Sequence, residues 1–152
     1  MKAVIQRVIN ASVTVDGNVK GKIKYGLLVY LGVAHDDTEK DADWLAEKVA
    51  HLRIFNDDSG VMNLSLKDIA PLDPGTGVLA ISQFTLLGDA RKGRRPSWNG
   101  AAPPEKAKEL YEYFIAQIKK HELICESGEF QARMLVNYTN DGPVTIILES
   151  AK

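Results

Sequence analysis

The chain has 152 residues, of which 45% are hydrophobic and 26% charged, a mixture that predicts one globular domain over residues 1–152. A formal net charge of −1 excludes a global field that attracts anionic partners, so contact with nucleic acid would require a local basic patch. The single Cys125 excludes an internal disulfide and no run reaches the ~20 apolar residues of a membrane span, so we expect a cytoplasmic protein without membrane contact.

The N-terminal quarter alternates between apolar and polar residues, which is typical of strands. Residues 2–8 and 11–17 are rich in valine and predict two strands, with a short break at residues 10–11. An Asp-Gly pair at residues 16–17 predicts a tight turn into a further strand. The continuous apolar run at residues 27–33 predicts a strand that is buried on both faces.

Two later segments have helical spacing. The first begins after Thr38, which is placed to cap a helix with Asp41 at the capping-box distance, and its apolar stripe includes Leu45 and Val49. The second begins at Pro104, a residue that suits the first turn of a helix. Its apolar face consists of Ala107, Leu110, Tyr111, Phe114 and Ile118.

The remaining segments alternate between strands and loops. Residues 78–88 predict an apolar strand, and residues 89–104 form a long polar connector without periodicity. Residues 122–128 and 130–140 predict strands, and residues 143–150 predict the last strand. This order predicts a single-domain α+β fold, with a mostly antiparallel or mixed, barrel-like sheet and two main helices.

The sequence offers little support for a metal or a cofactor. The three histidines, His35, His51 and His121, are scattered, and none lies in a ligand-spaced cluster. No glycine-rich nucleotide-binding loop is present, so we expect no cofactor and no metal. Cys125 lies in an apolar strand, where a buried inert thiol is favoured over a nucleophile.

The segment "SQFTL" places Ser82, Gln83, Phe84 and Thr85 within a predicted strand. Buried polar groups are costly unless they are paired, so three polar residues in an apolar strand need an explanation. One interpretation is an edge strand whose hydroxyl groups face water. The other is a pocket wall, in which the main-chain N–H groups and polar side chains face a polar ligand.

A basic loop is the densest positive patch of the chain. It contains Arg91, Lys92, Arg94 and Arg95, with Trp98 close by. The loop could serve solubility alone. Alternatively it contacts phosphate groups, because the guanidinium fork of arginine matches phosphate oxygens.

The segment "NDGPVT" contains Gly142 and Pro143 between two predicted strands. Proline lacks an N–H donor and is usually found at strand edges or in turns. Taken alone, this motif predicts a simple turn.

Considered together, these motifs resemble the D-aminoacyl-tRNA deacylase family along the whole chain. The resemblance includes "AVIQRV", "GLLVYLGV", "LRIFNDDSG", "ISQFTLLGD", "KGRRPSW", "SGEFQARMLV" and "NDGPVT". The chain departs from the family pattern at Gln131, Arg133 and Tyr138.

The resemblance implies a homodimeric hydrolase that binds tRNA. It would cleave the ester between a D-amino acid and the 3′-terminal adenosine, and it would also remove glycine. The resemblance implies a cis peptide bond at Gly142–Pro143, in a loop that enters the active site of the other subunit. It places "SQFTL" along the pocket, Arg7 as a support of the Gly-Pro loop, and Phe130 and Met134 in the lining.

A Gly-Pro filter suits an enzyme that accepts many D side chains and rejects L forms. Main-chain carbonyl groups can contact the amino group and the Cα of any amino acid, and an L side chain would clash with that backbone. For the hydrolytic step, the resemblance favours assistance by the 2′-hydroxyl of the tRNA, since no evident base activates a Thr85 nucleophile. A Thr85 nucleophile and a non-catalytic RNA-binding module are the alternatives.

Overall fold

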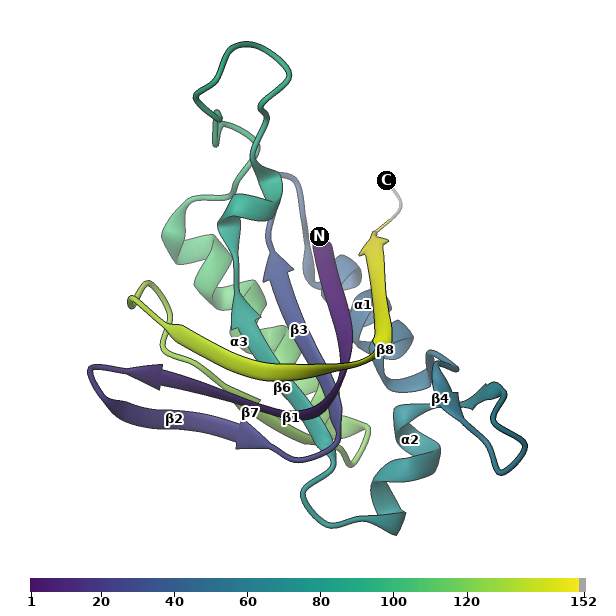
Figure 1. Ribbon diagram of the computed structural model, residues 1–152. Coiled ribbons are helices and arrows are strands. Elements are labelled where there is room, and N and C mark those ends of the chain that lie inside the picture. The colour runs from purple at the N-terminus through teal and green to yellow at the C-terminus, as the bar shows by residue number, and fades with distance from the viewer. Residues whose placement is uncertain (151–152) are drawn as a thin grey trace.

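The computed structural model describes residues 1–150, and its central element is a six-stranded mixed sheet. The strand order is β2-β1-β3-β6-β7, and β8 pairs with the other edge of β1 (Figure 1). The strands are β1 (Lys2–Val15), β2 (Asn18–Ile23), β3 (Gly26–Gly32), β6 (Gly77–Ser82), β7 (Ile124–Ser127) and β8 (Leu135–Glu149). Pairs that involve β1 are antiparallel, whereas β3–β6 and β6–β7 are parallel.

The centre of the sheet consists of β3 and β6, the two most apolar strands. Six of the seven residues of β3 are buried, as the continuous apolar run predicts. Strand β2 curls towards β7, where the position of a Cβ on Gly21 would lie 2.7 Å from the carbonyl oxygen of Ser127. The sheet is therefore nearly closed, which agrees with the predicted barrel-like shape.

Strand β1 is one continuous strand of 14 residues, so the predicted break at residues 10–11 is wrong. The exposed Ile9 and Asn10 lie where the register between β1 and β8 shifts, and the strand bends there without ending. Bulges of this kind bend a strand while the ladder continues on both sides.

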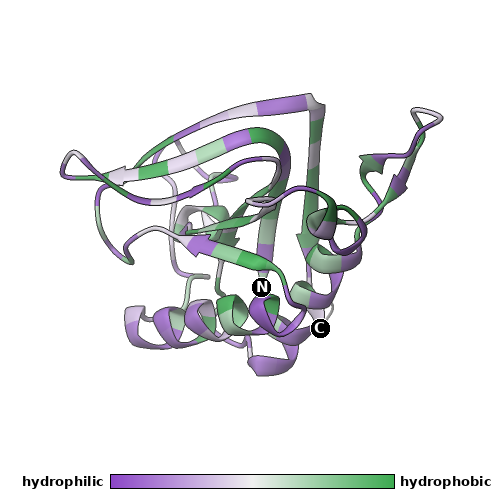
Figure 2. Ribbon diagram, turned by 90° about the horizontal axis from the view of Figure 1, so that it is seen from below, coloured by the Kyte–Doolittle hydropathy of each residue, from purple (hydrophilic) through white to green (hydrophobic). Residues whose placement is uncertain are grey.

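Helices α1 (Glu39–His51) and α3 (Pro104–Lys120) pack on one face of the sheet (Figures 1 and 2). The Thr38 N–H donates to Asp41 Oδ2 at 2.8 Å, which confirms the predicted cap of α1. Leu45 and Phe114 are fully buried between the helices and the sheet. Full burial of one such side chain contributes about 1.5–3 kcal/mol, so these apolar stripes anchor both helices.

Smaller elements lie between α1 and β6. A hairpin of β4 (Phe55–Asn56) and β5 (Met62–Leu64) is followed by α2 (Leu66–Ile69) and the 3-10 turn η1 (Ala70–Leu72). The predicted α+β class and the two main helices are confirmed, and the short α2 was not predicted. Within residues 1–150, no helix is both long and apolar enough to cross a membrane.

Candidate active site

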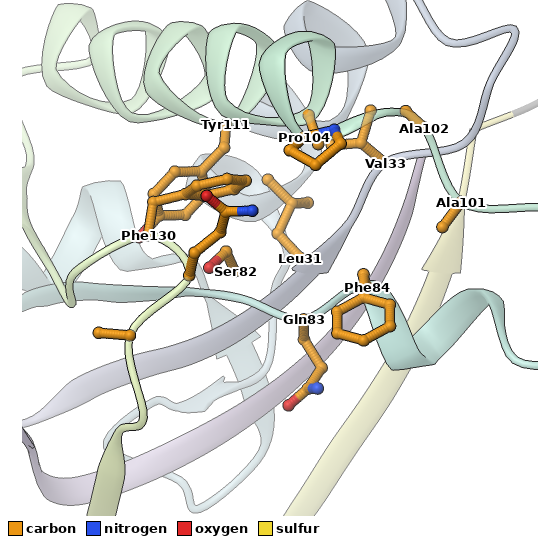
Figure 3. A pocket seen from close by; sticks show the side chains of 13 residues that line it. Leu31, Val33, Ser82, Gln83, Phe84, Ala101, Ala102, Pro104, Tyr111 and Phe130 are labelled. Carbon is orange, nitrogen blue, oxygen red and sulfur yellow. The ribbon is translucent and has the colours of Figure 1, made fainter. Parts of the chain in front are cut away.

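A cavity of about 490 Å³ lies where the carboxyl ends of β3 and β6 meet the start of α3 (Figure 3). Ligand sites of open α/β sheets commonly occur at the carboxyl ends of parallel strands. This volume is within the usual range of small-molecule sites. The cavity is lined by Leu31, Val33, Ser82, Gln83, Phe84, Ala101, Ala102, Pro104, Ala107, Tyr111, Phe130, Gln131 and Ala132.

The first three residues of the "SQFTL" segment form one wall of this cavity, and only Ser82 belongs to a strand. Strand β6 ends at Ser82, and the 3-10 helix η2 (Phe84–Leu87) follows, so the predicted strand over residues 78–88 is too long. Gln83 is the turning point, with φ −146° and ψ 79°. The interpretation of an edge strand is therefore wrong, and Ser82, Gln83 and Phe84 line the cavity.

The start of η2 presents main-chain N–H groups. Gln83 N–H donates to the carbonyl oxygen of Leu31 at 2.8 Å, and Leu86 N–H donates to that of Gln83 at 3.2 Å. Between them, the N–H groups of Phe84 and Thr85 belong to the first turn, whose donors have no partner within a helix. Of these two residues, Phe84 lines the cavity.

The Thr85 side chain lies outside the set of residues that line the cavity. Its Oγ1 accepts a hydrogen bond from the side-chain amide of Gln83. An amide cannot remove a proton from a hydroxyl group at neutral pH. This contact orients Thr85 but does not activate it.

The opposite wall of the cavity is aromatic. The rings of Tyr111 and Phe130 lie 6.0 Å apart between centroids at 38° (Figure 3). Tyr111 O–H donates to the carbonyl oxygen of Ala80 at 2.8 Å, which fixes α3 to β6. Burial raises the pKa of Tyr111, so its hydroxyl remains protonated and serves as a structural donor.

Met134, a predicted pocket residue, is half-buried, packs against a core cluster that includes Val13, Leu79 and Ile81, and is not in the lining set. Gln131, one of the departures from the family pattern, does line the cavity and has φ +63°. A non-glycine residue in this conformation is uncommon.

Residues Tyr111, Ala101 and Ala102 line the cavity but were not predicted as site residues. The sequence identified Tyr111 only as part of an apolar helix face. Helical spacing alone does not distinguish a residue that lines a cavity from one that packs in the core. A signal for the alanines was present in "GAAPP", because small residues directly before a helix leave room for a ligand.

Gly142 and Pro143 lie inside β8, so the predicted turn between two separate strands is wrong. The peptide bond between them is cis, as predicted. Both flanks of the motif pair with β1: Thr145 lies opposite Gln6, and Asn140 opposite Val8. The motif therefore bulges from the ladder opposite Arg7. It is exposed and is not part of the lining of the cavity in its own chain.

Arg7 holds this bulge in place from the neighbouring strand. Its side chain is buried, and Nε lies 2.9 Å from Asp141 Oδ2 as an ion pair. One guanidinium N–H donates to the carbonyl oxygen of Ile54 at 2.7 Å. The side-chain amide of Asn140 donates to the carbonyl oxygens of Arg7 at 2.9 Å and Val144 at 3.1 Å. The bulge is thus fixed at both ends.

The basic loop extends beyond the end of the sheet next to η2 (Figure 1). An antiparallel bridge between Asp89 and Ser97 closes its base, and all residues between them are exposed. Trp98 packs edge-on against Phe84, with ring centroids 5.4 Å apart, so the loop is joined to the cavity wall. Arg91 forms a fork with both carboxylate oxygens of Asp89, at 2.9 and 2.7 Å.

Cys125, His51 and His121 are outside the lining of the cavity. Cys125 is buried in β7, and burial raises its pKa to about 12, so the thiol is unreactive, as predicted. The prediction that the histidines are scattered is wrong for two of them. His51 and His121 lie together beside Glu47, because α1 and α3 bring these distant residues into contact.

Comparison with known proteins shows a match along nearly the whole chain. The family model described as "D-Tyr-tRNA(Tyr) deacylase" matches residues 4–149. A D-aminoacyl-tRNA deacylase of Koribacter versatilis (strain Ellin345) is 59% identical over 152 residues, which cover 100% of this chain and 99% of that protein. One of Kosmotoga olearia is 57% identical with the same coverage.

Two solved structures have the same fold. One, described as a "c-Myc DNA Unwinding Element Binding Protein", superimposes with a TM-score of 0.90 at 41% identity and covers 100% of both chains. The other, described as a probable eukaryotic D-amino acid tRNA deacylase, has a TM-score of 0.81 at 17% identity and covers 97% of both chains. At 17% identity, the second structure supports the fold alone.

Proposed function

The chain belongs to the D-Tyr-tRNA(Tyr) deacylase family, and from this premise we propose that it is a hydrolase that cleaves the ester bond of D-aminoacyl-tRNA. The observation that carries the proposal is the cavity of about 490 Å³, whose wall includes Phe84 at the first turn of η2. The products are the free D-amino acid and tRNA.

The lining of the cavity suits the end of an aminoacylated tRNA. Phe130, which packs beside the buried ring of Tyr111, offers aromatic surface to the base of the terminal adenosine, and aromatic stacking is a common way of binding unpaired bases. Ser82 and Gln83 offer polar groups for the ribose and the amino acid. One aminoacyl-adenosine end would thus contact both the aromatic and the polar parts of the cavity.

The catalytic step is proposed to rely on the substrate for its nucleophile. The N–H groups of Phe84 and Thr85 would stabilise the oxyanion that forms as the ester carbonyl is attacked. The neighbouring 2′-hydroxyl of the tRNA, which the cavity would hold in place, would assist that attack. We favour this route over a Thr85 nucleophile because a threonine hydroxyl needs a base to activate it, and Thr85 Oγ1 contacts the side-chain amide of Gln83, which is not a base.

Chirality is proposed to be read by Gly142 and Pro143 of a second subunit. Both residues are exposed and lie outside the cavity of their own chain, which supports the proposal that a partner in a homodimer supplies them. Their carbonyl groups would contact the α-amino group, and an L side chain would clash with this backbone. Glycine has no side chain and would pass the filter, so glycyl-tRNA is a further proposed substrate.

The basic loop is proposed to contact the tRNA backbone. Arg94 and Arg95 are exposed, and the contact between Trp98 and Phe84 places the loop next to the cavity. Arginine side chains suit phosphate groups. Because the proposed substrate is made for translation, the proposed compartment is the cytoplasm.

A direct test compares D-tyrosyl-tRNA with L-tyrosyl-tRNA at equal concentrations. We expect hydrolysis of the D ester, sparing of the L ester, and no loss of activity in a chelator. Equal rates on the two esters would contradict the filter, and no hydrolysis of either would contradict the proposed activity.

The alternative is a nucleic-acid-binding module without catalysis. The solved structure at 41% identity is described as a DNA unwinding element binding protein, and an exposed basic loop would serve such a role. Binding of tRNA together with an unchanged half-life of the D ester would favour this alternative.

A further inference from the structure

A cluster of metal-ligating side chains lies outside the proposed active site. It consists of Glu47 and His51 on α1 and His121 directly after α3. Each side chain offers one ligand atom, and these atoms all lie within 4.8 Å of one another. We propose that Glu47, His51 and His121 form a Zn²⁺ site that joins the C-terminal ends of α1 and α3.

The distances are close to those of a tetrahedral zinc site. Zinc bonds to nitrogen and oxygen of about 2.0–2.1 Å place neighbouring ligand atoms roughly 3.3 Å apart. His51 Nδ1 lies 3.1 Å from Glu47 Oε1 and 3.1 Å from the main-chain carbonyl oxygen of Glu47, and His121 Nε2 lies 3.6 Å from Glu47 Oε2. The two imidazole rings therefore approach different oxygens of one carboxylate, and a bound ion would displace the proton of His51 Nδ1.

The backbone makes part of this arrangement rigid. Glu47 and His51 are one helical turn apart, so they share a face of α1. His121 caps the C-terminus of α3, and its ring lies 5.4 Å from that of His51 between centroids. Side-chain exposures of 62%, 47% and 25% for Glu47, His51 and His121 leave access for a metal ion and for a water as fourth ligand.

Electrostatics at this place favours a cation. The C-terminal ends of two helices meet here, and each carries a partial negative charge of about −0.5. Two nearby cationic groups have other partners, since Lys48 lies over the ring of Trp44 and Arg53 binds the side chain of Asn63. Lys67 pairs with Glu122 and also donates to the carbonyl oxygen of His121 at 2.6 Å, so it offsets part of the negative charge at this end of α3.

The choice of zinc follows from the ligands. Two imidazoles and one carboxylate suit Zn²⁺, whereas Mg²⁺ prefers oxygen ligands. The proposed role is structural, because Tyr111 in the cavity lies ten residues before His121, about 15 Å along a helix axis. The metal would fix one helix end to the other, and the inference does not depend on the proposed deacylase activity.

Zinc binding to the tag-free protein tests this site, with a chromophoric chelator as competitor. We expect one Zn²⁺ per chain and no comparable binding of Mg²⁺. His51→Gln and His121→Asn should each weaken zinc binding by at least about tenfold, because one of three protein ligands is lost. His35→Asn is the matched control, since it removes the one histidine outside the cluster, and it should bind zinc like the unaltered chain.

Thermal unfolding gives a second readout. Zinc at 100 times its dissociation constant should raise the folding equilibrium constant about 100-fold, which is expected to raise the midpoint by about 5 °C or more. Circular dichroism checks that the variants fold. Failure of the unaltered chain to bind zinc, or equal binding in the cluster variants and the control, would show an ordinary surface ion pair and overturn the proposal. Loss of D-ester hydrolysis in a chelator would overturn the structural role.

Discussion

The Thr85 hydroxyl group lies beside an amide, and this contact separates two mechanisms. If Thr85 acts through its main-chain N–H, Thr85→Ala retains the group that matters. We expect hydrolysis of D-tyrosyl-tRNA by this variant to fall by less than about tenfold in single-turnover assays. A covalent aminoacyl ester on Thr85, trapped by acid quenching and found by mass spectrometry, would contradict this expectation.

The N–H group of Phe84 can be tested with a pair of variants. Phe84→Ala removes the ring and keeps the N–H, whereas Phe84→Pro removes both. Proline is tolerated at the first position of a helix, and Gln83 before it is outside the helical region at ψ 79°. We therefore expect Phe84→Pro to be about 100-fold slower than Phe84→Ala, the usual loss for one oxyanion donor. Equal rates would show that this N–H does not take part.

At the scale of the elements, the arginines of the basic loop differ in whether their charge is already paired within the chain. Hydrogen bonds from Arg91 lower the pKa of Asp89 to about 2, so this pair stays ionised and mutually neutralised at neutral pH. Arg94 and Arg95 are expected to supply the charge that tRNA meets. Replacing both with alanine should weaken tRNA binding and reduce the slope of log K against log salt by roughly 1.4–1.8.

Arg91→Ala is the control for this double variant and should change the slope less. The measurement is tRNA affinity across a salt series. An unchanged slope in the double variant would assign the loop to solubility.

Some elements of the fold could be predicted from the sequence and others could not. Helices α1 and α3 and strand β3 were predictable, because long periodic or apolar runs specify them locally. The end of β6 was not, since the apolar residues of η2 continue the pattern of a strand, whereas the chain turns at Gln83 into the 3-10 bond from Leu86 N–H to the Gln83 carbonyl oxygen. The continuity of β1 and β8 was equally hidden, because each strand stabilises the bend of the other.

For the candidate site, local patterns carried only part of the information. The "SQFTL" wall could be interpreted as either a pocket or an edge strand, and the role of Gly142–Pro143 came from the resemblance. The neighbourhood of His51 and His121 was missed because 70 residues separate them in sequence. Only the packing of α1 against α3 brings them together.

At the scale of the whole molecule, the proposed homodimer predicts complementation between two inactive variants. Ala107→Phe would fill the cavity from α3. Gly142→Ala would disturb the bulge, since its φ is +116° and an added Cβ would lie 2.8 Å from Val144 Cγ2 and 3.2 Å from an Arg7 guanidinium nitrogen. Each variant alone should be inactive on D-tyrosyl-tRNA.

Unfolding and remixing the two variants should restore activity if the Gly-Pro segment acts on the partner's cavity. Half of the random dimers would be mixed, and each would contain one intact site of two, so about one quarter of the unaltered activity is expected. Restoration to this level, measured after confirming dimers by light scattering, distinguishes action in trans from action in cis. No restoration would show that each chain uses its own segment.

The pairing of β1 with β8 has a consequence for the chain as it is being made. Strands β2 and β3 pair with β1 along one edge, and β8 alone covers the other. Residue 135 follows residue 15 by 120 residues, which at about 5–20 residues per second is a delay of roughly 6–24 s. For that time the second edge of β1 has no strand of its own chain to pair with, and an unpaired edge is where chains aggregate. Strand β8, which carries the proposed chirality filter, therefore also covers the second edge of β1, and it is the last strand to be made.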